Sequence, residues 1–177
     1  SEVNMGYKIL LVDDDSTLRR FVGEFLQNEN FEVLSAGSGP EALRLAYREH
    51  PHLVVLDVMM PGMDGWEVTV RLREMADVPI ILLTGKTTEA DKLRGFRLGV
   101  DDYMTKPFSF AELTARIQAV LNRAARRAGT AHHVLPVGEL SLDLDRREVR
   151  RGDQVIALTP TEFRLLEVLA QTPGSAV

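Results

Sequence analysis

The sequence predicts an α/β fold organised around a doubly wound, five-stranded parallel sheet. Short apolar runs alternate five times with segments whose apolar residues recur at helical spacing, and acidic or polar side chains follow directly after several of these runs. This alternation of strands and helices is expected, because consecutive parallel strands are joined by crossover helices. In open α/β sheets the ligand crevice lies beyond the carboxyl ends of the strands, so the polar residues there are the candidates for function.

The strand that ends at Asp57 is expected to lie at the centre of the sheet. Residues 53–56 read Leu-Val-Val-Leu, an uninterrupted apolar run typical of a strand buried on both faces, and Pro61-Gly62 forms a turn soon after it. Asp57 alone could simply open that turn, because aspartate is common there. Three other runs also end in polar residues: residues 8–12 before Asp13-Asp14-Asp15, residues 78–83 before Thr84, and residues 102–104 before Lys106.

Helices are expected between these strands, and two of their starts carry a clear signal. Ser38-Gly39-Pro40-Glu41 is a capping box with proline at the first helical position, and Ser109 with Glu112 three residues later is another. A fifth strand, residues 31–36, separates the first two helices. The expected helices cover about residues 16–27, 39–49, 66–72, 88–98 and 109–122.

After residue 122 the alternation stops. Residues 123–136 are rich in alanine and arginine and are predicted to be a helix tail and a linker, in which we assign no role to the histidines at 132 and 133. Short strands around 139–142, 148–150 and 154–157 predict a small antiparallel meander. A capping box at Thr159-Pro160-Thr161-Glu162 opens a helix to about residue 170, whose wide apolar arc requires neighbours on two sides.

The composition excludes several classes of protein. The 177 residues include no cysteine, which excludes disulfides and thiolate metal sites. No apolar stretch approaches the roughly 20 residues of a membrane span, so we expect a cytoplasmic location and no membrane partner. The net charge of −5 argues against coating nucleic acid through overall charge. Arginines clustered at 123–127 and 146–151 form either a solvated surface or a local phosphate-binding patch.

The polar residues at the strand ends together indicate a phosphoryl-transfer site. The carboxyl ends of parallel strands meet at one edge of the sheet, which brings together Asp13, Asp14, Asp57, Thr84 and Lys106. Crowded carboxylates repel one another, and Mg²⁺, a hard cation that prefers oxygen ligands, relieves that repulsion. We therefore expect Mg²⁺ as the cofactor.

These motifs, in this order, carry a family resemblance. Residues 8–122 resemble the receiver domain of two-component response regulators: an acid pair, Asp57 with Met-Met-Pro-Gly-Met-Asp-Gly after it, Thr84, and Lys106-Pro107. Residues from 137 onward resemble the start of an OmpR/PhoB-type winged-helix effector domain. The resemblance implies a flavodoxin-like (CheY-like) receiver over residues 1–122, a linker over 123–136, and the first part of a winged helix over 137–177.

The resemblance also implies a role for each residue of the acidic site. Asp57 is expected to be the phosphoacceptor, which takes a phosphoryl group from a sensor histidine kinase. Asp13, Asp14, Asp57 and the backbone carbonyl of Met59 are expected to hold Mg²⁺. Lys106 is expected to place its positive charge on a phosphoryl oxygen, aimed inward by a cis bond to the following proline.

Thr84 and Tyr103 are implied to form the switch. Thr84 donates a hydrogen bond to the phosphoryl group and moves toward it, and Tyr103 then turns in from solvent. The switched surface is the face made by the fourth helix, fifth strand and fifth helix, through which this subfamily forms a twofold dimer. The implied dimer contacts are Lys92 with Glu112, Asp102 with Arg116, Asp101 with Arg123, and an apolar patch including Leu98 and Ala115.

Three functions can be distinguished at this stage. The first is a DNA-binding response regulator of which this chain is a part; because no recognition helix or wing follows, the chain itself is expected to lack sequence-specific DNA binding. The second is a naturally truncated receiver that acts by protein contact or as a phosphate sink. The third is an aspartyl phosphatase, but such enzymes usually have a second acid two residues after the nucleophile, where this chain has Met59. We therefore expect a protein that accepts and loses a phosphoryl group without being a turnover enzyme.

Overall fold

The computed structural model describes residues 4, 6–85, 88–130, 134–144 and 147–171. The chain divides into two compact units, Ser1–Arg123 and Ala124–Val177. None of the helices in the described ranges is both long enough and apolar enough to cross a membrane.

The first unit contains the predicted five-stranded sheet, in the order β2-β1-β3-β4-β5 with all neighbours parallel. The central strand is the one that ends at Asp57, as predicted. Every residue of that strand and of its neighbour β4 is buried, as their continuous apolar runs require. The strands are β1 (Lys8–Val12), β2 (Glu32–Ala36), β3 (Leu53–Asp57), β4 (Ile80–Thr84) and β5 (Asp102–Thr105).

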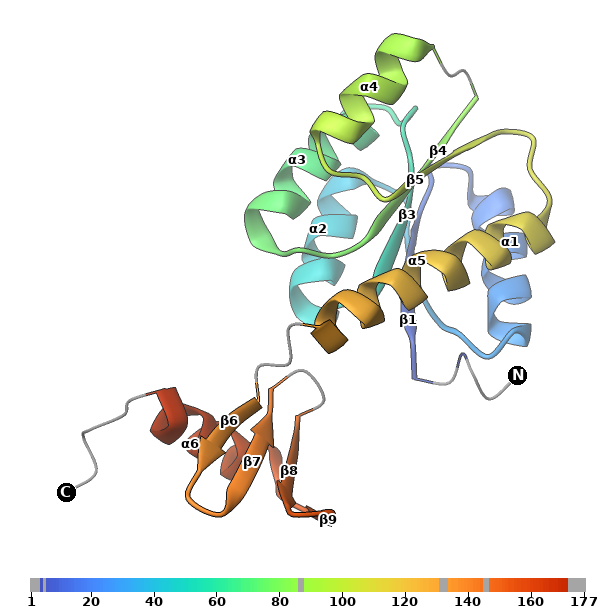
Figure 1. Cartoon of the computed structure of the whole chain (residues 1–177). Coiled ribbons are helices and arrows are strands. Elements are labelled where there is room, and N and C mark those ends of the chain that lie inside the picture. Colours follow the sequence, from blue (N-terminus) through green and yellow to red (C-terminus); the bar gives the residue numbers. More distant parts are fainter. Residues whose placement is uncertain (1–3, 5, 86–87, 131–133, 145–146, 172–177) are drawn as a thin grey trace. The chain divides into compact units, whose positions relative to one another are not determined.

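Five helices cover the two faces of this sheet, with α1 and α5 on one face and α2, α3 and α4 on the other (Figure 1). This arrangement confirms the predicted doubly wound fold. The helices are α1 (Ser16–Asn28), α2 (Gly39–Glu49), α3 (Gly65–Met75), α4 (Glu89–Arg97) and α5 (Phe110–Thr130).

Side-chain caps fix the starts of these helices. The hydroxyl of Ser38 accepts a hydrogen bond from the Glu41 amide, and that of Ser109 from the Glu112 amide, so both predicted caps are formed. Asp15 at the start of α1 accepts from two amides of the first turn. Each cap satisfies backbone donors that the helix itself leaves unpaired.

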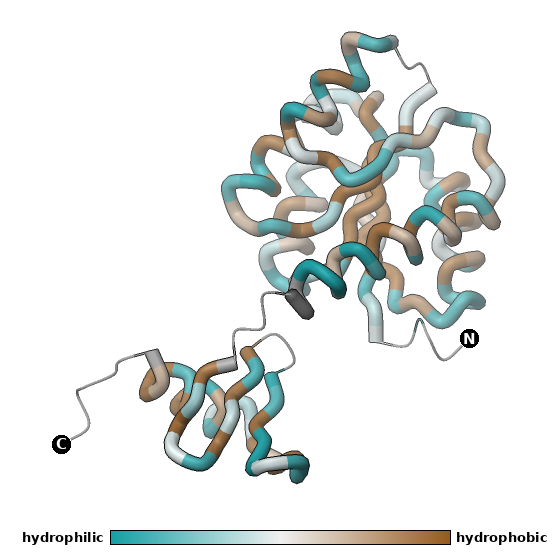
Figure 2. The backbone as a smooth tube through the Cα atoms, viewed as in Figure 1, coloured by the Kyte–Doolittle hydropathy of each residue, from teal (hydrophilic) through white to brown (hydrophobic). Residues whose placement is uncertain are grey.

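The sheet separates two apolar cores. One lies against α2 and α3 and includes Trp66 and Leu72, and the other lies against α1 and α5 and includes Leu26 and Ile117. Figure 2 shows the brown, hydrophobic strands running through the middle of the unit and alternating brown and teal along the helices. Alternate side chains of each strand point to opposite faces, so every strand contributes to both cores.

The second unit is an antiparallel sheet in the order β6-β7-β8-β9 followed by α6. Its small core consists of Leu142, Val149 and Phe163. Leu165, Val168 and Leu169 of α6 are exposed, so within the described residues the apolar arc of this helix is covered on one side only. The elements are β6 (Val134–Val137), β7 (Leu140–Asp143), β8 (Glu148–Arg151), β9 (Gln154–Ile156) and α6 (Pro160–Gln171).

The described parts of the segment predicted as helix tail and linker form a helix and a strand. Helix α5 continues to Thr130, because its alanines and arginines are good helix formers. Residues 134–137 form β6, which the sequence pattern did not reveal. Pro136 hides this strand in the sequence, yet proline is compatible with β6 because it is an edge strand paired on one side only. The histidines at 132 and 133 lie outside the described residues.

Candidate functional site

The site lies at the carboxyl edge of the parallel sheet, where β1 and β3 end. Asp57 is the last residue of β3 and is only 3% exposed, and Asp13, directly after β1, is 1% exposed. Asp14 beside it is exposed. One carboxylate oxygen from each of these three residues lies within 4.8 Å of the others. The structure thus brings the three predicted acidic residues into one cluster.

Lys106 reaches this cluster from the loop after β5. Its Nζ donates to Oδ2 of Asp13 at 2.9 Å and lies 3.4 Å from Oδ2 of Asp57. The bond between Lys106 and Pro107 is cis, as the resemblance implied. The other oxygen of Asp57 accepts from the Met59 amide at 3.2 Å.

The electrostatics of the cluster are those of carboxylates held together against their repulsion. The pKa of Asp57 is raised from 3.8 to about 6, because burial and the charge of Asp13 raise it by more than Lys106 and the Met59 amide lower it. Burial lowers the pKa of Lys106, but its contacts with Asp13 and Asp57 outweigh this and leave that pKa above its ordinary value. Without a metal ion, the single positive charge of Lys106 therefore faces three carboxyl groups. The oxygens of these groups are ligands that fit a hard divalent cation.

A hollow of about 440 Å³ opens beside Asp57 and contains one of the two predicted switch residues. It is lined by Val58, Met59, Trp66, Thr84, Gly85 and Asp91. Thr84 is the last residue of β4 and is buried. Thr84 follows Leu83, the residue of β4 that pairs with Asp57.

Tyr103 lies on β5 and packs under α4. Its hydroxyl donates to the carbonyl of Asp91 at 3.1 Å, and its ring lies 6.2 Å from that of Trp66. A Cβ at Gly95 would stand 2.5 Å from the Tyr103 ring, so this close approach requires glycine. Burial and the charge of Asp91 raise the pKa of Tyr103 to about 12. Tyr103 is half-buried in this structure rather than turned out to solvent.

The charged residues predicted for the dimer face lie on α4, β5 and α5, except Asp101, which directly precedes β5. Within the chain, Arg116 pairs with Asp102 at 3.0 Å and with Glu112 at 3.2 Å. Asp101 accepts from the Ile80 amide and lies 3.7 Å from Arg73. Each of these acids therefore already has a partner within the chain. Lys92 and Arg123 are exposed.

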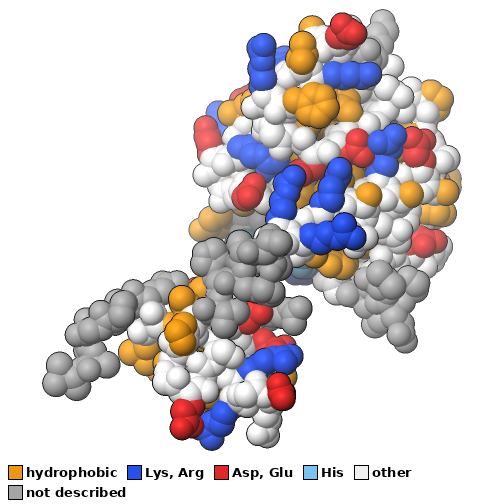
Figure 3. All heavy atoms as spheres, in the orientation of Figure 1, with side chains coloured by type: hydrophobic (Ala, Val, Ile, Leu, Met, Phe, Trp, Pro, Cys, Tyr) orange, Lys and Arg blue, Asp and Glu red, His pale blue; other side chains and the backbone are white. Residues whose placement is uncertain are grey.

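The apolar part of this face includes two residues that the resemblance did not name. Ala115 is exposed, and Leu98 is half-buried and packs against the core formed with α2 and α3. The large exposed apolar side chains of α4 are Leu93, at 56%, and Phe96, at 69%. Hydrophobic and basic side chains lie together over α4 in Figure 3. The helical spacing of residues 93 and 96 could have revealed this pair in the sequence.

Comparison with protein families matches residues 9–118 to the response regulator receiver domain. The chain belongs to the response regulators. A probable transcriptional regulator, ycf27, of Cyanophora paradoxa is 44% identical to this response regulator over 171 residues, which cover 94% of the chain and 72% of the relative. The transcriptional regulatory protein ResD of Bacillus subtilis is 42% identical over 171 residues, covering 94% and 71%.

Solved structures show the same receiver fold. The chemotaxis protein CheY4 of Vibrio cholerae superimposes with a TM-score of 0.63 at 33% sequence identity, covering 64% of this chain and 98% of that protein. Together these matches confirm the OmpR/PhoB-type response regulator that the motifs predicted. The receiver domain implies a role in two-component signalling.

Proposed function

We propose that this response regulator is switched by transfer of a phosphoryl group from a sensor histidine kinase to Asp57. The observation that carries the proposal is the position of Asp57: a buried carboxylate at the end of β3, clustered with Asp13 and Asp14 and 3.4 Å from the ammonium of Lys106. A carboxylate oxygen of Asp57 attacks phosphorus, a P–O bond forms, and the P–N bond of the phosphohistidine breaks with its electron pair returning to the imidazole. Such a transfer depends on positioning and charge neutralisation.

The donor set fits Mg²⁺. Asp13, Asp14 and Asp57 would hold the ion, together with the backbone carbonyl of Met59. When bound, it neutralises the carboxylates and the oxygens of the phosphoryl group. Lys106 keeps a fixed positive charge at the acceptor, where negative charge accumulates during transfer.

Phosphorylation of Asp57 would change the surface of the protein through Thr84 and Tyr103. A phosphorylated Asp57 carries about two negative charges, and Thr84, next to the β4 residue that pairs with Asp57, would offer its hydroxyl as a neutral donor. A shift of Thr84 changes the hollow that it shares with Trp66 and Asp91. Because Tyr103 bonds to the carbonyl of Asp91, that change is passed to α4.

The switched face would then bind a second copy of the chain. Leu93 and Phe96 supply exposed apolar surface, and Lys92, Glu112 and Arg123 supply exposed charges. Arg116 and Asp102 would exchange their contacts within the chain for contacts between copies. Exposed charge pairs contribute little energy, so the apolar residues provide most of the affinity and the charges determine the register.

The biological output would be regulation of transcription, as the names of the relatives state for those proteins. We propose no turnover of a substrate. The position two residues after Asp57 is Met59, which cannot transfer a proton. In this proposal the second unit is the first part of a DNA-binding effector domain.

Phosphorylation is tested by intact-mass measurement after incubation with acetyl phosphate and Mg²⁺. We expect a mass gain of one phosphoryl group in the wild-type chain and in Asp77→Asn, an exposed aspartate far from the cluster in sequence. Asp57→Asn should gain none. Labelling that persists in Asp57→Asn would refute the assignment of the acceptor.

A further inference from the structure

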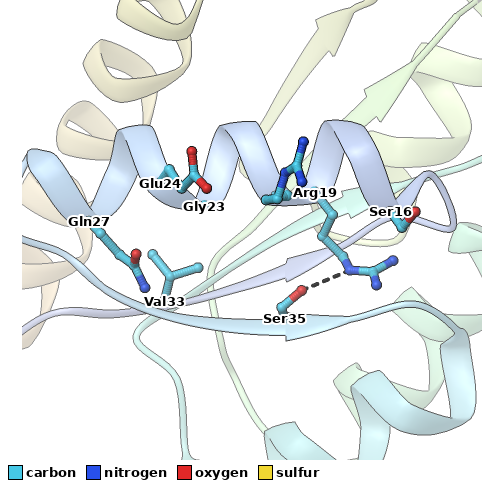
Figure 4. Close-up of a pocket in the computed structure, with 8 residues that line it drawn as sticks. Ser16, Arg19, Gly23, Glu24, Gln27, Val33 and Ser35 are labelled. Atoms are coloured by element: carbon cyan, nitrogen blue, oxygen red, sulfur yellow. Dashed lines mark hydrogen bonds between the residues drawn. The ribbon is translucent and has the colours of Figure 1, made fainter.

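Arg19 lies outside the acidic cluster, on α1, but contacts its backbone. Nη1 of Arg19 donates to the carbonyl oxygen of Asp13 at 2.6 Å, and Nε donates to the hydroxyl of Ser35 on β2 at 2.8 Å (Figure 4). The Arg19 side chain therefore links α1, β2 and Asp13, which follows β1. This contact lies at the edge of the sheet that carries the acidic cluster. The proposed phosphoryl transfer assigns it no role.

The Asp13 carbonyl needs this donor because the ladder between β1 and β2 ends at this point. The two strands pair as far as Val12 with Ala36, and the Asp13 amide makes one more bond, to the Ala36 carbonyl at 3.2 Å. β2 then ends, and the amide of Gly37 turns to the carboxylate of Glu41 at 2.9 Å. A partly buried carbonyl without a donor is costly, and Arg19 supplies one from the neighbouring helix.

Gly37 leaves the space that the guanidinium occupies. A Cβ at Gly37 would stand 3.0 Å from Nη1 and 3.4 Å from Cζ of Arg19, which is tighter than ordinary contact. Gly37 has no left-handed backbone conformation to explain the glycine. The missing side chain at Gly37 instead leaves room for the guanidinium of Arg19.

The contact between Arg19 and the Asp13 carbonyl affects the acid pair, Asp13 and Asp14. With it, every polar group of Asp13 is engaged: the amide with Ala36, the carbonyl with Arg19, Oδ1 with the Asp15 amide at 2.9 Å, and Oδ2 with Lys106 at 2.9 Å. The carbonyl of Asp13 belongs to the same planar peptide as the amide of Asp14. Holding that plane fixes the point from which the Asp14 side chain leaves the backbone.

We propose that Arg19 is a positioning residue for the divalent-cation site, acting through the Asp13 carbonyl on the carboxylates of Asp13 and Asp14. The inference rests on the proposed function, because it assumes that this cluster binds Mg²⁺. The inference also predicts the direction in which the Mg²⁺ affinity changes when Arg19 is removed. The positive charge of Arg19 repels a cation, so if charge alone mattered, removing Arg19 would tighten Mg²⁺ binding; positioning requires that removal weakens it.

The test is Mg²⁺ binding to the full chain by titration calorimetry, without a phosphoryl donor. We expect Arg19→Ala to raise the Kd for Mg²⁺ roughly tenfold, in the range found for groups that orient metal ligands. Gly37→Ala keeps the charge of Arg19 but displaces its guanidinium, and should weaken binding in the same direction. Arg20→Ala removes the same charge from the next position of α1, where the side chain lies over the ring of Phe21, and should leave the Kd within about twofold.

A second measurement separates positioning from loss of structure. The acetyl phosphate rate of Arg19→Ala should return to within about twofold of the wild-type rate at saturating Mg²⁺, because added metal compensates for weak binding but not for a damaged fold. If Arg19→Ala fails to fold, Gly37→Ala decides the question. Unchanged or tighter Mg²⁺ binding in both folded variants overturns the inference. Absence of Mg²⁺ binding by the wild-type chain would instead refute the proposed function.

Discussion

Replacing Asp57 by asparagine should stabilise the metal-free first unit at neutral pH. The pKa of Asp57 is raised from 3.8 to about 6 in the folded protein, because the carboxylate is buried and faces Asp13. Ionising Asp57 therefore costs the folded state more than the unfolded state. The contribution of Asp57 to stability is therefore fully present below pH 3.8 and is lost as the pH rises through about 6.

The size of the effect follows from this shift of about two pKa units, each worth about 1.4 kcal/mol. Asparagine has the same shape and still accepts from the Met59 amide, but it does not ionise. We expect Asp57→Asn to be more stable than wild type by roughly 0.5 kcal/mol at pH 4 and by about 3 kcal/mol at pH 7. Mg²⁺ should shrink the difference, because it stabilises the wild-type cluster by binding.

The assay is urea unfolding in EDTA at pH 4, 5.5 and 7, followed by the fluorescence of Trp66, which is the only tryptophan of the chain and lies in the first unit. Asp77→Asn makes the same change of charge at an exposed position and controls for net charge. Equal stability of wild type and Asp57→Asn at pH 7, or a difference that does not shrink toward pH 4, would refute the reasoning.

Three further outcomes are expected. Lys106→Ala removes the cation 3.4 Å from Asp57 and should raise the Asp57 pKa above its value of about 6 in metal-free protein, as measured by carbon NMR; an unchanged or lower pKa contradicts this. Gly95→Ala places a Cβ 2.5 Å from the Tyr103 ring and should cost about 1–3 kcal/mol in thermal unfolding, whereas wild-type stability would show that the ring moves freely. Phe96→Ser should weaken dimerisation of the beryllium fluoride complex roughly tenfold in sedimentation, and an unchanged dimer would remove Phe96 from the interface.

Most of the first unit could be predicted from local patterns. The order of strands and helices, the caps at Ser38 and Ser109, and the burial of the strand before Asp57 all follow from hydrophobic period and capping chemistry. These features are local, because each depends on residues within a few positions of one another. The meeting of Asp13, Asp14, Asp57 and Lys106 could also be predicted, because parallel strands bring their carboxyl ends to one edge.

Two features of the structure were not predicted. Strand β6 pairs with β7 across a short turn, but its proline and flanking residues carry no strand period. Leu98, just after α4, packs against the core, whereas Leu93 and Phe96 of that helix are exposed. Helical spacing places Leu93 and Phe96 on one side of α4, but which side of the helix faces the core depends on the elements that pack against it.

The sequence by itself determined which residues are acidic, basic or hydroxylated at the ends of the strands, and so the chemistry of the site. Tertiary structure decided how those residues are held. It set the burial that raises the pKa of Asp57, the place of Tyr103 under α4, and the contact from Arg19 to the carbonyl of Asp13. The physical reason is that pKa values and side-chain contacts depend on the neighbours a folded chain brings together, and those neighbours come from different elements.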